Sequence, residues 1–291
     1  MEAFREMGIV ITSTCTPYLS GNLPRYREHI AWSESSAVSF ANSVIGARTN
    51  REGGPSALAA ALCGRTPDYG LHRDENRSPT VVIDVEAALR YNADFGALGY
   101  HVGKLVKNKI PYFRGIKEDA NTDQLKALGA AMAASGAVAL YHAEGLTPEA
   151  HHMDLKDLET ITVEDRDVKE TYEKLNTGDE PDIIILGCPH SSLREIGALA
   201  KEVEGKTLKK PVWICTSRVM KEAADRMGYT AIIEKAGGHV VADTCMVVSP
   251  IERMGVGTTG VNSGKAANYL PGFCKQKVVF NNIHELIRGV I

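Results

Sequence analysis

Several features that would place the chain in a membrane or on nucleic acid are missing from its sequence. There is no run of about 18 apolar residues, the length that a membrane-spanning helix needs, and the N-terminus has no signal-peptide pattern. Neither sign of charge predominates, because 33 Lys and Arg residues stand against 36 Asp and Glu residues. A basic surface for nucleic acid is therefore not indicated. We expect a cytoplasmic protein that binds neither membranes nor nucleic acid.

Closely spaced cysteine pairs are also missing. The six cysteines stand at positions 15, 63, 188, 215, 245 and 274, too far apart for the Cys-x(2–4)-Cys pairs of zinc fingers and ribbons. A disulfide framework is not expected in a reducing compartment. Three readings are left, namely buried thiols, one catalytic thiol, or a metal site assembled from distant segments. Composition does not choose among them.

Short apolar runs rich in β-branched residues alternate with helical patterns along the chain, and this indicates an α/β fold. Such strands are typical of parallel sheets that helices cover on both faces. We expect at least two α/β units, residues 1–155 and 156–291, connected through the charged segment 154–179. The strands are predicted at 9–12, 81–85, 138–142, 182–186, 212–215, 240–242, 246–248 and 278–280. The helices are predicted at 30–40, 56–62, 122–134, 163–175, 191–203, 217–227 and 284–288, while 91–105 is ambiguous.

Three cysteines stand at or beside the ends of predicted strands. Cys15, Cys188 and Cys245 hold these positions, and in open α/β sheets ligands gather beyond the carboxyl ends of strands. Three thiolates that meet at one point suit an iron–sulfur cluster, whose remaining open iron acts as a Lewis acid toward a substrate hydroxyl. Spacing alone does not separate this hypothesis from six thiols scattered through an α/β protein.

The other three cysteines have weaker signals. Cys215 also ends a strand, and both a functional role and a buried position stay open for it. Cys63 ends an Ala-rich helix and is expected to be a small core residue. Cys274 is given no role.

Several motifs carry a resemblance to a known family. They are Cys15-Thr-Pro-Tyr-Leu, the segment 41–56, Gly187-Cys-Pro-His190, Ala242-Asp-Thr-Cys245 and the segment 259–269. With these motifs the sequence resembles the large, catalytic subunit of the aconitase X family over essentially its whole length. The N-terminal part of the family's large subunits is expected to be missing here.

The resemblance implies an aconitase-like fold and an iron–sulfur-dependent hydro-lyase. It implies that Cys15, Cys188 and Cys245 hold the iron centre, with a 4Fe-4S cluster favoured over a 2Fe-2S cluster or a single iron. It also implies a small swivelling-domain subunit as partner and a small anionic hydroxy acid as substrate. Two activities occur in the family, dehydration of (R)-mevalonate 5-phosphate to trans-anhydromevalonate 5-phosphate and dehydration of cis-3-hydroxy-L-proline. We favour the first, because the chain has no fused swivelling domain.

Two polar loops are candidates for binding the anionic substrate. In the loop 46–56, Arg48 and Arg51 can grip a carboxylate or phosphate in forked geometry, beside Asn50. The alternative is a solvated turn with surface arginines. The Gly-rich stretch 258–265 offers backbone amides with Asn262, Ser263 and Lys265 as an anion cradle, against the alternative of a mobile surface loop.

Glu34, Ser35 and His190 are the candidates for catalysis. A Glu near a metal site can take a proton in the dehydration, although Ser and Glu at a helix start are also ordinary capping residues. His190 can orient a leaving hydroxyl or bond to cluster sulfur, against the alternative of a merely hydrogen-bonded histidine.

Three rival interpretations remain open. The chain could be a catalytically incompetent scaffold that binds a partner subunit. It could be an amidohydrolase with Cys188 as nucleophile and His190 as base, although residues two apart on a turn seldom align for this. Finally, His142, His151 and His152 with Glu144 and Asp154 could bind a metal, but their spacing matches no helical two-histidine motif and a surface loop is favoured.

Overall fold

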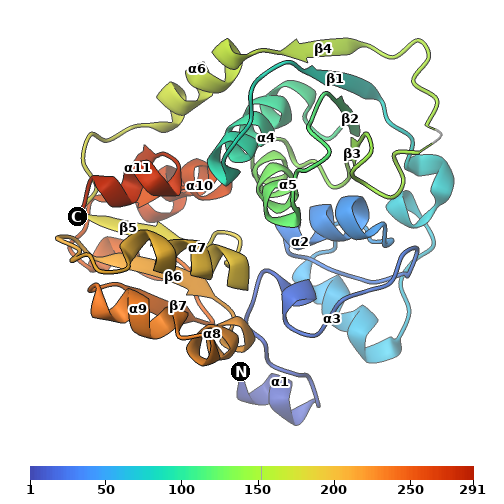
Figure 1. The fold of residues 1–291 in the computed structure, drawn as a ribbon. Coiled ribbons are helices and arrows are strands. Elements are labelled where there is room, and N and C mark those ends of the chain that lie inside the picture. The colour runs from blue at the N-terminus through green and yellow to red at the C-terminus, as the bar shows by residue number, and fades with distance from the viewer. Residues whose placement is uncertain (152) are drawn as a thin grey trace.

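The chain folds into two parallel α/β units that follow a region of short helices (Figure 1). The structure, a computed structural model, describes residues 1–151 and 153–291. The described strand pairs of both sheets are parallel. The α/β fold class predicted from the sequence is confirmed. Within the described part of the chain, no helix has the length and apolar character needed to cross a membrane.

The first sheet has the strand order β3-β2-β1-β4. Its strands are β1 (Val81–Val85), β2 (Pro111–Arg114), β3 (His142–Ala143) and β4 (Thr160–Val163). The helices of this unit are α4 (Asn92–Val106), α5 (Thr122–Gly136) and α6 (Asp165–Leu175). Because β4 pairs with β1, a division at residue 155 would separate two neighbouring strands. We therefore propose that the boundary between the sheets lies after β4.

The second sheet has the strand order β7-β6-β5-β8-β9. Its strands are β5 (Ile183–Leu186), β6 (Val212–Thr216), β7 (His239–Ala242), β8 (Thr258–Val261) and β9 (Lys277–Phe280). Its helices are α7 (Leu193–Val203), α8 (Arg218–Arg226), α9 (Tyr229–Lys235), α10 (Gly264–Cys274) and α11 (Ile283–Arg288). Alternate residues of β5 enter two different cores. Ile184 and Leu186 face α7, α9 and α11, whereas Ile183 and Ile185 face the core that includes α10.

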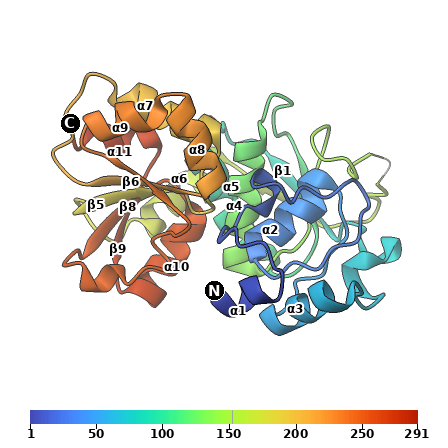
Figure 2. The same ribbon diagram turned by 90° about the horizontal axis from the view of Figure 1, so that it is seen from below.

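The two units meet where α10 packs against α4 and α5 (Figure 2). Glycines make this approach close, since a Cβ on Gly264 of α10 would lie 2.5 Å from the Gly96 carbonyl oxygen of α4. Within the first unit, a Cβ on Gly99 of α4 would lie 2.3 Å from the Leu128 carbonyl oxygen of α5. The glycines of α4 made the segment 91–105 ambiguous in the sequence, because glycine disfavours an isolated helix. Packing against α5 therefore stabilises a helix that local propensity does not predict.

Gly99→Ala is expected to destabilise the fold by about 1–3 kcal/mol, because the added methyl group overpacks the α4–α5 contact. Gly272 in α10 is the matched control, since a Cβ there meets nothing within 4 Å. Gly272→Ala should change stability by less than ~1 kcal/mol, in the stabilising direction, through helix propensity. Urea denaturation of both variants measures the difference, and equal midpoints would show that the helices are not in close contact.

Residues 1–75 are all described and contain no sheet. Their helices are α1 (Glu2–Glu6), α2 (Ser35–Phe40), its π-helical continuation η2 (Ala41–Ile45) and α3 (Gly54–Cys63). Short 3-10 helices occur here and elsewhere, at η1 (Pro17–Leu19), η3 (Gly70–His72), η4 (Asp74–Asn76) and η5 (Ile251–Arg253). The predicted strand at 9–12 is wrong: the segment pairs with no described neighbour, and Val10 is 83% exposed.

Other predicted boundaries also need correction. The helix predicted at 30–40 begins only at Ser35, because residues 29 and 32 form parallel bridges with residues 48 and 51. The segment 246–248 is a turn rather than a strand, and the strand predicted at 138–142 is reduced to β3. The Gly-rich stretch 258–265 is not a surface loop. It forms the buried strand β8 and the start of α10.

Candidate active site

The carboxyl ends of the second sheet bring candidate residues from separate segments together. Cys188 follows β5, Ser263 follows β8, and Cys245 follows β7. From β5 the sheet continues through β6 and β7 on one side and through β8 and β9 on the other, so the strand order reverses between β5 and β8. Ligands of open α/β sheets bind at such switch points. The Ser263 hydroxyl donates to the carbonyl of Cys188 and connects the two strand ends.

His190 connects the three loops that carry Cys15, Cys188 and Cys245. Its backbone N–H donates to Sγ of Cys15 over 3.1 Å. Its ring lies 2.9 Å through Nε2 from the Thr244 carbonyl oxygen and 2.8 Å through Nδ1 from the Thr14 hydroxyl. A carbonyl can only accept, so Nε2 carries the proton and Nδ1 accepts from Thr14. Burial lowers the pKa of His190, which keeps the ring neutral in this role.

The three thiols lie close enough to influence one another's ionisation. Burial raises the pKa of Cys15 to about 11, while Lys265 opposes the rise. Burial likewise raises the pKa of Cys188, with Cys245 and Cys15 adding to the rise and Lys265 again opposing it. Without a metal these two thiols are protonated at neutral pH, and a bound metal would displace their protons.

Cysteine thiols are the donors that iron–sulfur clusters take. Thiolates on one metal, each at about 2.3 Å, must lie within roughly 4 Å of each other. Across residues 1–151 and 153–291, no three His, Cys, Asp or Glu side chains form a group that could hold a metal ion. Thiolates that bind different irons of a cluster can be farther apart, and an N–H donor to sulfur is typical of such sites.

The buried Lys265 and the partly exposed Glu34 form an ion pair beside the thiols. Glu34 caps α2 through the backbone N–H of Ala37 (2.8 Å) and accepts from the Ser36 hydroxyl (2.6 Å). Lys265, 7% exposed, contacts the Glu34 carboxylate and lies 3.0 Å from the Ser36 hydroxyl. Burial would lower the pKa of Lys265, but Glu34, Cys188 and Cys15 outweigh it and raise the value. Ser35, also buried, reaches Glu34 only at 3.5 Å.

Burial would raise the pKa of Glu34, yet Lys265 outweighs burial and lowers it. Glu34 is therefore ionised, and it remains partly exposed, with a side-chain accessibility of 33%. Glu34 can therefore cap α2 and still be available to take part in the reaction.

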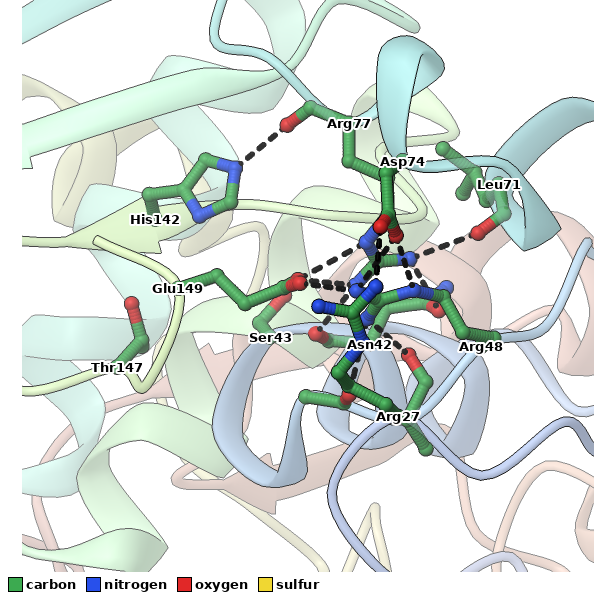
Figure 3. Close-up of polar contacts among 12 residues, drawn as sticks. Arg27, Asn42, Ser43, Arg48, Leu71, Asp74, Arg77, His142, Thr147 and Glu149 are labelled. Atoms are coloured by element: carbon green, nitrogen blue, oxygen red, sulfur yellow. Dashed lines mark hydrogen bonds and ion pairs between the residues drawn. The ribbon is translucent and has the colours of Figure 1, made fainter. Parts of the chain in front are cut away.

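The loop 46–56 lies in a different network, shown in Figure 3. Arg48 is 3% exposed and contacts Glu149 at 2.6 Å, Asp74 at 3.0 Å and the Gly46 carbonyl at 3.0 Å. Its guanidinium is thus occupied by groups of the chain, and we do not carry Arg48 further as a substrate ligand. Asn50 is similarly engaged with the backbone of Tyr69 and Leu71. Arg51 is exposed.

A second buried network, which the sequence did not reveal, supports the Cys188–His190 turn. Lys126 of α5 contacts Glu195 of α7, lies 3.2 Å from Asp123 and 3.3 Å from the His190 carbonyl oxygen. Ser192 donates to Asp123 over 2.9 Å. Beside this network, Asn262 lines a cavity of about 210 Å³ between the two units. The network fixes the cysteine turn of the second unit against a helix of the first.

The structure bears on the rival interpretations. Both ring nitrogens of His190 are hydrogen-bonded away from Cys188, so this histidine is not placed to activate that thiol. His142 is buried in β3 and bonds through Nε2 to the Arg77 carbonyl, and Glu144 is exposed. His152 lies outside the described residues.

The remaining cysteines differ in burial. Cys215 is buried in β6, and burial raises its pKa to about 12, with Cys245 adding to the rise. Cys274 is buried at the end of α10. Cys63 is exposed, so its expected place in a core is wrong: the helix that it ends has no buried residue.

Comparison with known proteins places these features in a family. Models of the first, second and third domains of aconitase X match residues 1–75, 79–173 and 181–291. The phosphomevalonate dehydratase large subunit of Methanocaldococcus jannaschii is 58% identical over 99% of this chain and 74% of its own length. The cis-3-hydroxy-L-proline dehydratase of Pseudomonas aeruginosa is 34% identical over 99% of this chain and 52% of its own.

A solved structure agrees with these sequence matches. The crystal structure of Thermococcus kodakaraensis aconitase X in its holo-form is 51% identical and superposes with a TM-score of 0.95. The match covers 100% of this chain and 75% of that chain. With domain models matched along nearly its whole length, the chain belongs to the aconitase X family.

Proposed function

We propose that the chain is the large, catalytic subunit of an iron–sulfur-dependent hydro-lyase that dehydrates (R)-mevalonate 5-phosphate to trans-anhydromevalonate 5-phosphate. The observation that carries the proposal is that His190 joins the loops of Cys15, Cys188 and Cys245 by hydrogen bonds, with the Lys265–Glu34 pair also in contact with the helix start after the Cys15 loop. The proposal includes a small swivelling-domain subunit as partner, since the named relatives are large subunits. We place the reaction in the cytoplasm.

The chemistry proposed for the site is an elimination of water. The substrate loses a hydroxyl from one carbon and a proton from its neighbour, and a double bond forms between them. Cys15, Cys188 and Cys245 would hold the cluster, which supplies a Lewis acid for the leaving hydroxyl when it is bound. A 4Fe-4S cluster remains our preferred form, because three cysteine ligands would leave one of its four irons without a protein ligand.

The chain's own residues have separate roles in this proposal. Glu34 accepts the proton, because Lys265 keeps its carboxylate ionised and the side chain is partly exposed. Lys265, with Asn262 and Ser263 near the same strand end, neutralises and orients the anionic substrate. His190 holds the loop of Cys15 against the Cys188 turn and is a positioning residue.

Sequence identity favours the phosphorylated substrate. Four phosphomevalonate dehydratase large subunits are 50% to 58% identical to this chain. The two cis-3-hydroxy-L-proline dehydratases are 34% and 32% identical. The second activity is kept as the alternative, because both relatives match nearly the whole chain.

The direct test compares both substrates with the reconstituted large subunit and its small subunit under anaerobic conditions. The proposal expects dehydration of (R)-mevalonate 5-phosphate, followed by the appearance of the conjugated product in the ultraviolet. Turnover of cis-3-hydroxy-L-proline alone would replace the substrate assignment. A cluster-loaded complex that turns over neither compound would support the scaffold interpretation.

Lys265→Met is expected to lower kcat/KM by about 10²–10³-fold, the loss typical when one charge-stabilising group is removed. Lys265 is the largest influence that opposes burial at Glu34, so its loss should raise the pKa of Glu34 and move the acidic limb of the pH–rate profile to higher pH. Lys201→Met, at an exposed position of α7, is the control and should leave the profile unchanged. An unmoved acidic limb in Lys265→Met would remove Glu34 as the base.

A further inference from the structure

The cavity between the two units lies on the other face of the second sheet from Cys188. Its lining includes Leu186 of β5 and Ile214 of β6. These two side chains belong to the core on the α7 and α11 side of the sheet, whereas Cys188 belongs to the core on the α10 side. Among the described residues no cysteine lines the cavity, and neither do Lys265 and Glu34. The cavity is therefore a different place from the candidate active site.

Apolar side chains form one part of the lining. Besides Leu186 and Ile214, they are Ala93 at the start of α4, Ala198 of α7 and Ile283 at the start of α11. The volume of about 210 Å³ is that of roughly seven water molecules. It is smaller than the roughly 300–1,000 Å³ of sites for drug-sized ligands. Size and lining together favour a small molecule with a short aliphatic body.

Ser191 contributes a polar group to the same lining. The residue is only 2% exposed, and both of its backbone groups are bonded. Its N–H donates to the Cys215 carbonyl over 2.9 Å, and its carbonyl accepts from the Thr216 hydroxyl over 2.7 Å. Within residues 1–151 and 153–291, no hydrogen bond reaches the Ser191 hydroxyl. Buried polar groups are almost always paired in folded proteins, so this hydroxyl is available to a ligand.

Two arginines of the lining have guanidinium groups that are available to an anion. Arg90 and Arg194 both line the cavity and both are exposed. In the part of the chain that the structure describes, the Arg90 side chain enters no hydrogen bond or ion pair. Arg194 approaches only Asp123, at 4.0 Å. This differs from Arg48, whose guanidinium is occupied by groups of its own chain.

The two carboxylates of the lining are already paired. Asp123 lies 3.2 Å from Nζ of Lys126 and accepts from the Ser192 hydroxyl over 2.9 Å. Glu195 contacts the same lysine and accepts from the Asn92 amide over 3.0 Å. Three helices also begin at the cavity, α4, α5 and α7, and with 15, 15 and 11 residues each adds the positive end of a helix dipole. The charges around the cavity therefore favour an anion over a cation.

We propose that this cavity is a second binding site, which takes a small molecule with a short aliphatic body and a phosphate or carboxylate group. The body lies against Leu186, Ile214 and Ala198. The Ser191 hydroxyl hydrogen-bonds to the ligand, and Arg194 with Arg90 binds the anionic group. Binding here needs neither a cluster nor turnover, so it is independent of the proposed activity.

The test is calorimetric titration of the purified chain with 3-methylbutyl phosphate and, separately, with 4-methylpentanoate. We expect at least one of them to bind with a Kd below about 1 mM. The two titrations distinguish a site for phosphate from a site for carboxylate. Inorganic phosphate lacks the aliphatic body and 3-methylbutanol lacks the charge, so each should bind at least about tenfold more weakly.

Variants of α7 locate the bound probe. Ala198→Phe fills the cavity from an exposed position and should weaken binding by about tenfold or more. Lys201→Phe adds the same ring one turn further along α7, outside the lining, and should weaken it less than twofold. Arg194→Gln should weaken binding of the anion by about tenfold and leave binding of 3-methylbutanol unchanged. Unaltered urea midpoints show that these surface variants keep the fold.

A separate variant distinguishes this cavity from the thiol site, because Asn262 lines both the cavity and the crevice at Cys188. Lys265→Met removes the cation of the thiol site and should leave the affinity for the probe unchanged. A tenfold loss in Lys265→Met would place the probe at the thiol site and overturn the proposal. Failure of both aliphatic anions to bind, or equal affinity in Ala198→Phe and the unmodified chain, would overturn it as well.

Discussion

Cys188→Ser is expected to abolish dehydration and to strip iron from the purified protein. Cys188 is 6% exposed and follows β5 at the switch point of the second sheet. Loss of a group that hydrogen-bonds to a metal ligand typically lowers metal affinity or activity by about 10–100-fold. Loss of the ligand itself should therefore lower activity by more than about 100-fold. The measurement is the rate of dehydration together with iron per chain.

Cys63→Ser is the matched control for this variant. Cys63 is exposed at the end of α3, and its Sγ contacts only the carbonyl of Arg65 at 3.6 Å. Iron content and rate should equal those of the unmodified protein. If Cys188→Ser kept its iron and its activity, the turn after β5 would not be part of the metal site.

Glu149→Gln is expected to destabilise the fold by about 3–5 kcal/mol, the range for removing one partner of a buried ion pair. Glu149 contacts Arg48 at 2.6 Å and Nε of Arg77 at 2.9 Å, and both arginines are at most 3% exposed. Among residues 1–151 and 153–291, the neutral amide leaves the exposed Asp74 as the one carboxylate paired with these two buried guanidinium groups. Figure 3 shows how these side chains converge. Denaturant titration measures the loss.

Glu159→Gln tests whether the effect comes from burial. Glu159 pairs with Lys109 at 3.4 Å, and their side chains are 63% and 50% exposed. Surface pairs contribute about 0–1 kcal/mol, so this variant should keep nearly the full stability. Equal losses in the two variants would contradict the buried network as a determinant of stability.

The sequence predicted the position of Cys188 in the fold better than the polar network around it. Cys188 follows an unbroken apolar strand, and this pattern places it correctly at the carboxyl edge of a sheet. Asp123 and Lys126 gave no such signal, because a pair three apart on a helix is usually a solvated ion pair. They are buried where α5 meets the turn from His190 to Ser192 and Glu195 at the start of α7. The capping pair Ser192 and Glu195 was the one local sign of this network.

The errors in the fold have a common physical origin. The β-branched run at 9–12 suits a strand, but a strand needs a partner, and local sequence does not report one. Conversely, the glycine within 258–261 argues against a strand, yet a Cβ on Gly260 would lie only 3.0–3.3 Å from Ile184, Pro181 and Leu286, so a glycine suits this close packing. Arg48 carried a plausible signal for anion binding, and the anions that it binds are carboxylates of its own chain.

The most direct test of the central claim is the iron and acid-labile sulfide content of the anaerobically reconstituted chain. The claim is that Cys15, Cys188 and Cys245 form the ligand set of one iron–sulfur cluster. It predicts iron and sulfide in equal amounts, with the broad visible absorbance of a cluster, and the loss of both in Cys188→Ser. A well-folded chain that binds iron without sulfide, or that binds neither, would contradict it.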